Sequence, residues 1–349
     1  MIDPFLLAKP FLHFLDPESA HEMTLCALET GLVPGQPRED DPILGVQLFG
    51  RALRNPVGLA AGFDKNGRVY DLMAAHGFGF AEIGGVTPRP QRGNPRPRVF
   101  RLPADRAVIN RMGFPNDGAD ALEARMQRKG RSPLGVGVNL ASNADSADPA
   151  ADFLTLATRF APYADYLTLD VSCPNTANGQ VFLDPERLAD LLAQLAAIPW
   201  VSAGPAMVAK LSPDVDDALL ARLVAVLLDA RIDGIMVANS TRARPPLRDP
   251  AGSEAGGLTG VPLMAPSTAM LARVRELTGG AVTLIGVGGI ASGADAYAKI
   301  RAGASAVQLY TGLIYEGTAL VTRVKRELAA LLRRDGFGSV AEAAAAGAG

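Results

Sequence analysis

The chain has few of the residues that mark disulfide-stabilised or metal-binding proteins. It contains two cysteines, Cys26 and Cys173, in 349 residues. So wide a separation argues for a reducing compartment rather than a disulfide framework. The three histidines, His13, His21 and His76, share no spacing typical of metal ligands. We therefore expect neither a disulfide nor a metal site.

A strong net charge and a long apolar run are missing as well. The 34 basic and 36 acidic residues nearly cancel, so no overall field attracts nucleic acid and no nucleic-acid partner is expected. No basic stretch followed by an unbroken apolar run opens the chain, which argues against a cleaved signal or a spanning helix. Aromatic residues make up only 6% of the chain, whereas hydrophobic residues make up 48%. This composition is typical of an α/β protein with a large core.

The first thirty residues form a distinct segment. Apolar residues recur at helical spacing in Phe5–Leu15 and again in Ala20–Leu28. Between them, Asp16 and Pro17 can cap and begin a second helix. Two short amphipathic helices are expected, and they either pack on the main domain or bind a membrane surface. We assign residues 1–40 to this N-terminal extension and residues 41–349 to the main domain.

From Pro56 onward, short apolar segments alternate with helical patterns such as Pro185–Ile198 and Val215–Arg231. Eight strands in regular alternation favour a closed parallel (β/α)8 barrel, a TIM barrel, with a doubly wound sheet as the alternative. The predicted strands are Val57–Ala60, Phe80–Val86, Leu134–Leu140, Tyr166–Ser172, Ala206–Leu211, Gly234–Asn239, Thr283–Gly288 and Ala306–Thr311. Two longer excursions, Pro88–Arg111 and Arg242–Gly260, interrupt the alternation and are candidate lids.

Polar residues and glycines gather where these strands end. In a parallel barrel the carboxyl ends of all strands meet on one rim, where the chemistry is done. A turn glycine or a capping asparagine explains any one of these positions, but a shared site explains all of them. Near the last two strand ends, Gly288, Gly289, Thr311 and Gly312 offer close backbone N–H groups, and a helix begins near Ser292. This arrangement is typical of a phosphate site, although two ordinary tight turns remain possible.

The fourth strand ends in Asp170, Ser172, Cys173 and Asn175. A free cysteine is usually a small buried residue with no chemistry, but this one stands on the rim. Two lysines on the same rim, at positions 65 and 210, can stabilise negative charge on an electron-accepting ring, or one can form a Schiff base. The asparagines at positions 110, 175 and 239 favour the first, because amides suit a small ring bearing amide groups and a carboxylate.

The rim motifs resemble those of the dihydroorotate dehydrogenases, and in particular the quinone-linked class, over nearly the whole chain. The extension contributes Leu15–His21 to the match. The remaining matching motifs are Ala60–Gly67, Val86–Gln91, Gly93–Pro103, Asn110–Phe114, Ser172–Thr176, Gly286–Ile290 and Ala302–Ser305.

The resemblance implies FMN on the barrel rim, oxidation of dihydroorotate to orotate in pyrimidine biosynthesis, and quinone as the electron acceptor. Cys173 would be the catalytic base, and His21 and Arg101 would line the quinone entrance. The residues implied for FMN are Ala61, Gly62, Phe63, Asp64, Lys65, Gly85, Asn139, Asp170, Lys210, Ala238, Gly260, Gly289, Tyr310 and Thr311. Those implied for dihydroorotate are Lys65, Asn110, Arg111, Met112, Gly113, Phe114, Asp170, Asn175, Asn239 and Ser240. The extension would make a peripheral contact with the cytoplasmic side of a membrane.

Four positions depart from the pattern of that class. Cys173 replaces a serine and Asp170 replaces an asparagine shared by flavin and substrate, while Gly85 and Ala238 lack hydroxyls that usually contact the flavin. An ionised carboxylate only accepts hydrogen bonds, so Asp170 bears on which substrate fits. The alternatives are a related FMN oxidoreductase acting on another dihydropyrimidine, a flavin-binding barrel without turnover, or a phosphate-ligand lyase that uses Lys210.

Overall fold

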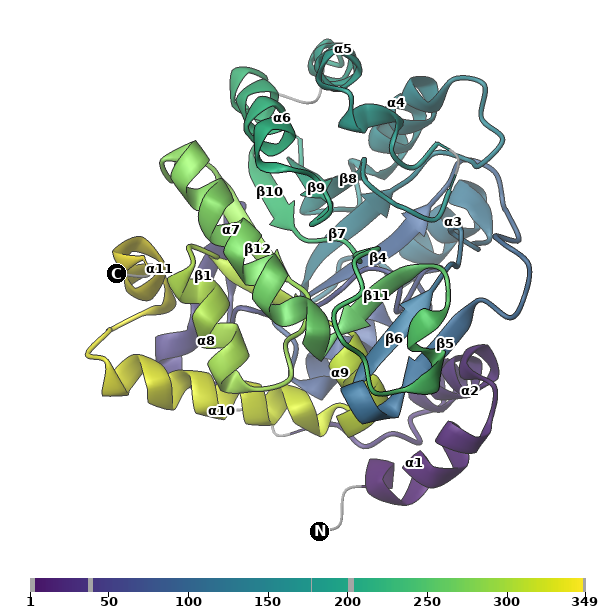
Figure 1. Cartoon of the computed structure of the whole chain (residues 1–349), viewed down its shortest axis with the longest axis vertical. Coiled ribbons are helices and arrows are strands. Elements are labelled where there is room, and N and C mark those ends of the chain that lie inside the picture. The colour runs from purple at the N-terminus through teal and green to yellow at the C-terminus, as the bar shows by residue number, and fades with distance from the viewer. Residues whose placement is uncertain (1–3, 37–39, 177, 200–203, 348–349) are drawn as a thin grey trace.

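The computed structural model describes residues 4–36, 40–176, 178–199 and 204–347. In this part of the chain, eight parallel strands close into a barrel in the order β10-β12-β13-β3-β4-β7-β8-β9 (Figure 1). The expected TIM barrel is therefore confirmed. The strands are β3 (Val57–Leu59), β4 (Phe80–Val86), β7 (Gly135–Leu140), β8 (Tyr166–Asp170), β9 (Ala206–Leu211), β10 (Gly234–Val237), β12 (Thr283–Val287) and β13 (Ala306–Leu309).

Each barrel strand lies within its predicted range. Five of them stop one or two residues earlier at the carboxyl end than the apolar pattern indicates; β8, for example, ends at Asp170 rather than at Ser172. The last ladder pair between β8 and β9 is Asp170 with Lys210. The residues that follow leave the ladder, so their side chains lie at the barrel mouth rather than within the sheet.

Helices cover the outside of the barrel (Figure 1). In α5 (Pro185–Ala196), the Asp184 carboxylate accepts the N–H groups of Glu186 and Arg187, and the predicted leucine face is buried. Capping of this kind satisfies backbone donors that the first helical turn leaves unpaired. The other barrel helices are α3 (Gly118–Lys129), α4 (Pro149–Phe160), α6 (Asp217–Asp229), α7 (Met264–Thr278), α8 (Gly293–Arg301), α9 (Thr311–Glu316), α10 (Ala319–Arg334) and α11 (Val340–Ala346). Short 3₁₀ helices lie at Pro42–Leu44, Tyr70–His76, Pro103–Asp105, Val181–Leu183, Pro250–Ser253 and Val261–Leu263.

A small hairpin closes the amino-terminal end of the barrel. Its strands are β1 (Val46–Leu48) and β2 (Arg51–Leu53), and its buried leucines pack in one cluster with Phe80 and Tyr166 from the barrel. Three-residue strands are too short to show an apolar period, so the sequence pattern did not reveal them. The hairpin seals the end of the barrel opposite the strand ends that carry the polar residues.

The two excursions form one antiparallel sheet instead of two separate loops. Strands β5 (Val99–Leu102) and β6 (Ala107–Asn110) come from the first excursion, and β11 (Gly257–Gly260) comes from the second. The side chains of Leu102, Ile109 and Leu258 form a buried cluster of their own. This packing holds Asn110 and the segment after it at the barrel mouth.

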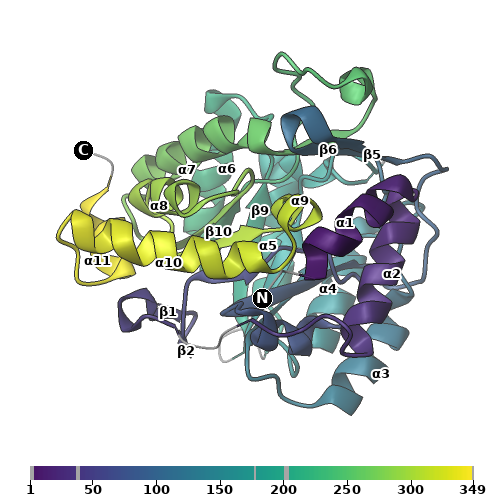
Figure 2. The ribbon, with the colours of Figure 1, turned by 90° about the horizontal axis from the view of Figure 1, so that it is seen from below.

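The N-terminal extension consists of α1 (Pro4–Phe14) and α2 (Pro17–Glu29), which confirms the two expected helices. Asp16 caps α2 by accepting the N–H groups of Glu18 and Ser19. The pair lies beside β5 and α9 (Figure 2). In the described residues, no helix combines the length and the hydropathy needed to cross a membrane. The division of the chain at residue 40 stays a prediction.

Candidate active site and its connection to the N-terminal helices

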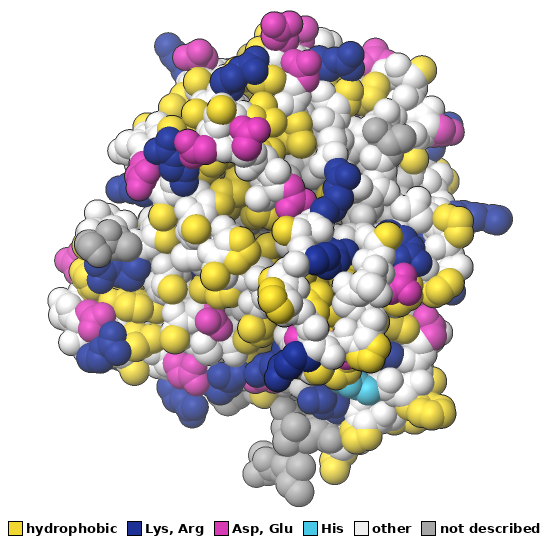
Figure 3. Space-filling model, in the orientation of Figure 1, with side chains coloured by type: hydrophobic (Ala, Val, Ile, Leu, Met, Phe, Trp, Pro, Cys, Tyr) yellow, Lys and Arg dark blue, Asp and Glu magenta, His cyan; other side chains and the backbone are white. Residues whose placement is uncertain are grey.

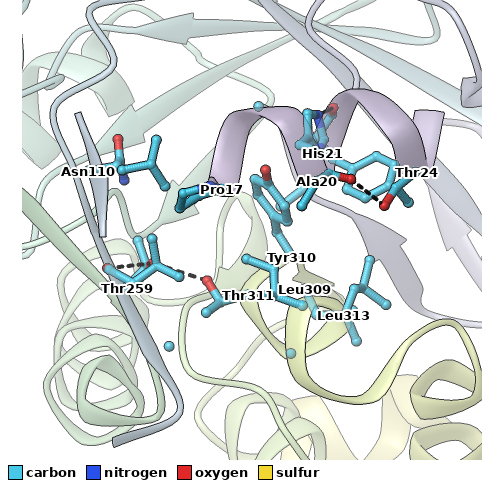
Figure 4. Close-up of a pocket in the computed structure, with 18 of the residues that line it drawn as sticks. Pro17, Ala20, His21, Thr24, Asn110, Thr259, Leu309, Tyr310, Thr311 and Leu313 are labelled. Carbon is cyan, nitrogen blue, oxygen red and sulfur yellow. Dashed lines mark hydrogen bonds between the residues drawn. The ribbon is translucent and has the colours of Figure 1, made fainter. Parts of the chain in front are cut away.

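A single cavity of about 1310 Å³ runs from the mouth of the barrel to the N-terminal helices. The strand ends of the barrel line its inner part. The outer part lies under α1 and α2, where Pro17, Ala20 and His21 face Tyr310 and Leu313 across the cavity (Figure 4). The extension is therefore one wall of the site rather than a separate module.

Nearly all of the residues singled out from the sequence line this cavity. They come from every strand end of the barrel and from the extension. They are His21, Ala61, Gly62, Phe63, Lys65, Gly85, Arg101, Asn110, Met112, Gly113, Phe114, Asn139, Asp170, Cys173, Asn175, Lys210, Ala238, Asn239, Ser240, Gly260, Gly289, Tyr310 and Thr311.

Two residues of the expected set do not line the cavity. The Asp64 carboxylate is buried and accepts the backbone N–H groups of Arg68, Val69 and Tyr70, so it stabilises the turn after β3. Arg111 directs its guanidinium away from the mouth, donating to Glu254 and to backbone carbonyls and covering the Phe100 ring. Both residues position the segments that carry their neighbours.

Asp170 is paired within the protein. Its Oδ1 accepts a hydrogen bond of 2.9 Å from Asn239 Nδ2, and its Oδ2 lies 3.7 Å from Lys210 Nζ. Asn239 also donates to Ser172 Oγ at 3.4 Å. A buried acceptor with these partners does not pay the penalty of an unsatisfied group. The replacement of an amide by a carboxylate at this position is therefore compensated by a cation and an amide.

Cys173 is 7% exposed and follows directly on this cluster. Burial, and after it the negative charge of Asp170, raise the pKa of its thiol to about 12, although Lys210 acts in the opposite direction. The backbone of Asn175 and the side chain of Thr176 also lower the thiol pKa, but by less than burial and Asp170 raise it. The ordinary thiol pKa near 8.5 therefore does not apply here, and the neutral thiol is the resting form.

Lys65 and His21 meet where the barrel mouth joins the extension. The Lys65 ammonium donates to the Gly62 carbonyl at 2.7 Å, and burial lowers the pKa of this lysine to about 8. His21 Nε2 hydrogen-bonds to the Phe63 carbonyl at 2.8 Å. Burial, followed by the charge of Lys65, lowers the pKa of His21 to about 4. The imidazole is therefore neutral at physiological pH.

A polar cluster inside the barrel fixes the floor of the cavity. The Glu82 carboxylate accepts hydrogen bonds from Asn139 Nδ2 at 3.0 Å, Gln308 Nε2 at 2.7 Å and the Tyr166 hydroxyl at 3.0 Å. Glu82 thus accepts from the amide nitrogen of Asn139 and from that of Gln308. The amide oxygens of these two side chains are buried and have no hydrogen-bond partner. Asn139 and Gln308 both line the cavity. Two unpaired acceptors at the floor fit a ligand that carries N–H groups.

Two glycines at the rim of the cavity allow close packing within the protein. A Cβ on Gly85 would lie 2.7 Å from the Phe114 ring and 3.1 Å from Asn139 Oδ1, so Phe114 takes the space of a side chain here. Gly289 has a φ of +82°, and a Cβ there would lie 2.4 Å from the backbone of Met264. Gly289 and Thr311 border the same cavity, and Ser292 caps α8 directly after the glycines. This is the expected phosphate site, and it stays an expectation.

Sequence reasoning missed three residues of the site. Glu82 and Gln308 lie in correctly predicted strands, where a lone polar residue in an apolar run was the available signal. Thr176 belongs to a recognised motif, but its contact with the thiol depends on the loop conformation. No sequence pattern reports that conformation.

The N-terminal extension, which walls the outer part of the cavity, carries exposed apolar side chains. Phe14 is 89% exposed and Leu7 is 73% exposed on α1, and Phe11 and Leu32 are exposed as well. Hydrophobic side chains gather on the surface over α1 and α2 (Figure 3). Exposed apolar side chains in one cluster mark an interaction surface.

Comparisons with known proteins agree with this geometry. The family model described as dihydroorotate dehydrogenase matches residues 43–332. A protein of Rhodospirillum rubrum named dihydroorotate dehydrogenase (quinone) is 49% identical, and the match covers 99% of this chain and 95% of that protein. A mitochondrial protein of Arabidopsis thaliana with the same activity in its name is 42% identical over 97% of this chain and 80% of its own.

Solved structures show the same likeness in three dimensions. A crystal structure of DHODH from Eimeria tenella in complex with ferulenol is 37% identical and superposes with a TM-score of 0.90, covering 94% of each chain. The ligand-free form of DHODH from that organism gives the same TM-score and covers 95% of this chain and 99% of the other. This chain belongs to the dihydroorotate dehydrogenase family.

Proposed function

We propose that this protein oxidises dihydroorotate to orotate in pyrimidine biosynthesis, with FMN as its cofactor and a quinone as the electron acceptor. The observation that carries the proposal is the single cavity that joins Cys173 at the barrel mouth to the apolar helices of the extension. A polar, buried inner part suits a small charged substrate, and an apolar outer part suits a quinone. The two reactants can then use opposite ends of one site.

The residues at the inner end fit FMN. The unpaired Asn139 oxygen would accept from an N–H group of the flavin ring, Lys65 and Lys210 would supply positive charge, and Gly289 and Thr311 would offer backbone N–H groups to the phosphate. Backbone at Gly85 and Ala238 can contact the ring without side-chain hydroxyls. The proposed FMN residues are Ala61, Gly62, Phe63, Lys65, Gly85, Asn139, Asp170, Lys210, Ala238, Gly260, Gly289, Tyr310 and Thr311.

FMN, when bound, supplies a two-electron acceptor that can take hydride and pass electrons to quinone. The protein's own part in the chemistry is a proton transfer. Once its thiol has released its own proton to solvent, Cys173 Sγ would take the proton from the substrate ring carbon; Asn175 and Thr176 lower the thiol pKa and so favour the thiolate that does this. The sheet β5-β6-β11 forms part of the cavity wall beside this step.

The proposed substrate residues come from three segments at the barrel mouth. The end of β6 and the residues after it supply Asn110, Met112, Gly113 and Phe114, the end of β8 and the loop after it supply Asp170 and Asn175, and the segment after β10 supplies Asn239 and Ser240. Lys65 offers a cation for the substrate carboxylate. Asp170 is paired with Asn239 and Lys210. The amide side chains of Asn110 and Asn175 remain available to bind the substrate ring.

The proposed quinone entrance lies between α1, α2 and the barrel. His21 packs edge-on against Phe63, with ring centroids 5.2 Å apart, and faces Tyr310 (Figure 4). The Arg101 guanidinium donates to the Leu12 carbonyl at 2.8 Å and to the Leu15 carbonyl, and so holds the junction of α1 and α2. The exposed apolar side chains of α1 insert into a membrane from its cytoplasmic side. Quinones are dissolved in that membrane.

One observation favours a second candidate, an FMN oxidoreductase acting on another dihydropyrimidine. Asp170 stands at the carboxyl end of β8, at the barrel mouth, and directs its carboxylate toward Asn239 and Lys210. A substrate with an additional N–H group near this carboxylate would gain a hydrogen bond that dihydroorotate does not make.

Anaerobic titration of the purified protein tests both candidates. We expect a flavin absorption spectrum, bleaching of that spectrum by dihydroorotate, and recovery of the colour when a soluble quinone is added. A protein without flavin absorption would refute the FMN proposal. A flavin spectrum that another dihydropyrimidine bleaches and dihydroorotate does not would establish the second candidate.

A further inference from the structure

A short line of polar contacts connects the N-terminal extension to the loops at the barrel mouth. It begins at Glu18, in the first turn of α2. The Arg98 guanidinium donates three hydrogen bonds to this carboxylate, from Nη2 to Oε1 at 2.7 Å and from Nε to Oε2 at 3.1 Å and to Oε1 at 3.2 Å. Arg98 is only 6% exposed, so the pair is shielded from water and its charges are screened little.

The same guanidinium organises the loop that precedes it. Arg98 Nη1 donates to the Arg92 carbonyl at 2.6 Å and to the Asn94 carbonyl at 2.8 Å. Gly93 lies between these two carbonyls with a φ of +71°, and a Cβ there would lie 2.8 Å from Nη1. The loop is therefore wrapped closely around one end of Arg98 while Glu18 holds the other end.

Asn94 then joins two loops that we assign to the substrate. Its side-chain Nδ2 donates to the Arg111 carbonyl and to the Asn175 carbonyl, both at 2.9 Å. Its backbone N–H donates to the Met112 carbonyl, also at 2.9 Å. The first loop continues into Phe114, and the second carries the catalytic thiol two residues before Asn175. Asn94 thus sets the spacing between them.

We propose that Glu18, acting through Arg98 and Asn94, is a positioning residue for the dihydroorotate site. This inference rests on the proposed function and assigns the extension a role besides quinone access. When α2 is seated on the barrel, Glu18 holds Arg98, Arg98 holds the loop, and Asn94 holds the two substrate loops at the correct separation. Binding couplings are reciprocal, so substrate in its site also stabilises the seat of α2 on the barrel.

The buried charge of Arg98 explains how the loss of Glu18 affects the residues that Arg98 contacts. Removing the Glu18 carboxylate leaves a buried guanidinium without its counter-ion, which is far more costly than losing a surface ion pair. Arg96 also contacts Glu18, at 3.0 Å, but its side chain is 66% exposed and it can turn to water. Arg98 cannot, so it must move and release the two carbonyls that it holds.

The chain offers a matched control on the same helix. Glu29, in the last turn of α2, pairs with Arg68 of the barrel at 2.6 Å. That ion pair also ties α2 to the barrel, but within the described part of the chain the Arg68 side chain donates to Glu22, Cys26 and Glu29 and makes no hydrogen bond to Asn94 or to the two loops that Asn94 joins. Glu18→Gln and Glu29→Gln therefore remove equal charges from one helix, and only the first acts on the line to Asn94.

The first measurement is the dissociation constant of orotate in the FMN-loaded protein, followed by the shift of the flavin absorption band. We expect Glu18→Gln to weaken orotate binding about tenfold, within the range usual for coupled sites, and to leave the KM for a soluble quinone unchanged. Glu29→Gln should change neither value. Equal effects of the two variants on orotate, or an effect of Glu18→Gln on the quinone KM alone, would overturn the proposal.

A double-mutant cycle shows whether the contacts act in series. Asn94→Ala should weaken orotate binding, and adding Glu18→Gln to it should bring no further loss, because the line is already cut. Additive losses would mean that Glu18 acts by another route, and would refute the proposed line.

Hydrogen exchange separates this inference from the proposed function. In the ligand-free protein, Glu18→Gln should speed exchange of backbone amides in residues 92–116, and Glu29→Gln should not. If neither variant alters exchange there, the inference fails. If dihydroorotate never bleaches the flavin in the unsubstituted protein, the proposed function fails instead.

Discussion

Asp170, the last residue of β8, is the ladder partner of Lys210 on β9, and their side chains form a buried ion pair with Oδ2 3.7 Å from Nζ. The pair places a carboxylate beside the lysine that the proposed flavin would face. Asp170 also precedes Cys173 by three residues, and its carboxylate raises the pKa of the Cys173 thiol. One residue thus acts on both the cofactor site and the proposed base.

Asp170→Asn should make the bound flavin easier to reduce. Removing a negative charge beside the ring favours the reduced, more negative flavin. We expect the two-electron potential to rise by about 30 mV, which corresponds to a tenfold change in the equilibrium. Equilibration with a reference dye measures the potential. An unchanged or lower potential would show that the carboxylate does not act on the flavin.

Cys173→Ala should abolish dihydroorotate-dependent bleaching and spare FMN binding. The substitution removes the proposed proton acceptor, and positioned bases contribute factors of about 100 or more. Stopped-flow absorbance measures the bleaching, and the flavin content of the purified variant serves as the control. Bleaching at the unsubstituted rate would exclude this thiol from the mechanism.

The rate of flavin reduction should rise with pH over the whole accessible range. The pKa of the Cys173 thiol is raised to about 12, so the thiolate is the minor form at neutral pH. Its fraction, and with it the rate, should grow about tenfold per pH unit while the pH stays below this pKa. Asp170→Asn should shift the profile toward lower pH. A plateau near neutral pH in the unsubstituted protein would contradict this assignment.

The extension should loosen in mild acid because of His21. Burial and the charge of Lys65 lower the pKa of His21 to about 4, below its value near 6.5 in an unfolded chain. For a depressed pKa, the stabilising contribution is complete above 6.5 and is lost as the pH falls toward 4. We expect the melting temperature to fall over this range less steeply in His21→Phe than in the unsubstituted protein. Parallel curves would mean that His21 does not titrate with unfolding.

Phe14→Ser should weaken binding to phospholipid vesicles. Phe14 is 89% exposed on α1, and burying one phenylalanine side chain in lipid contributes about 2 kcal/mol, so partitioning should drop by more than tenfold. Vesicle co-sedimentation measures it. Flavin reduction by dihydroorotate should be unchanged, because Phe14 lies outside the barrel mouth. Unaltered sedimentation would locate the membrane contact elsewhere or exclude it.

The sequence by itself determined the barrel and the membership of its rim. Apolar segments near position 57 and onward to position 309 have the period and spacing of βα units, and this local pattern sets strand and helix boundaries within two residues. Because parallel strands present their carboxyl ends on one side, the sequence alone groups the rim residues from Lys65 to Thr311. The sequence did not predict the hairpin β1-β2 or the sheet β5-β6-β11, because strands of three or four residues are too short to show an alternation of apolar and polar residues.

Only the tertiary structure determines the charge partners and pKa values of the site residues and the contacts between distant segments. The amide and cation that compensate Asp170 lie 69 and 40 residues farther along the chain, and no local pattern reports such a meeting. The raised pKa of the Cys173 thiol follows mainly from burial, and burial exists only in the folded protein. Glu82 and the line from Glu18 through Arg98 to Asn94 likewise consist of contacts between distant segments. Local periodicity follows from neighbouring residues, whereas these contacts exist only after the barrel closes and the extension packs against it.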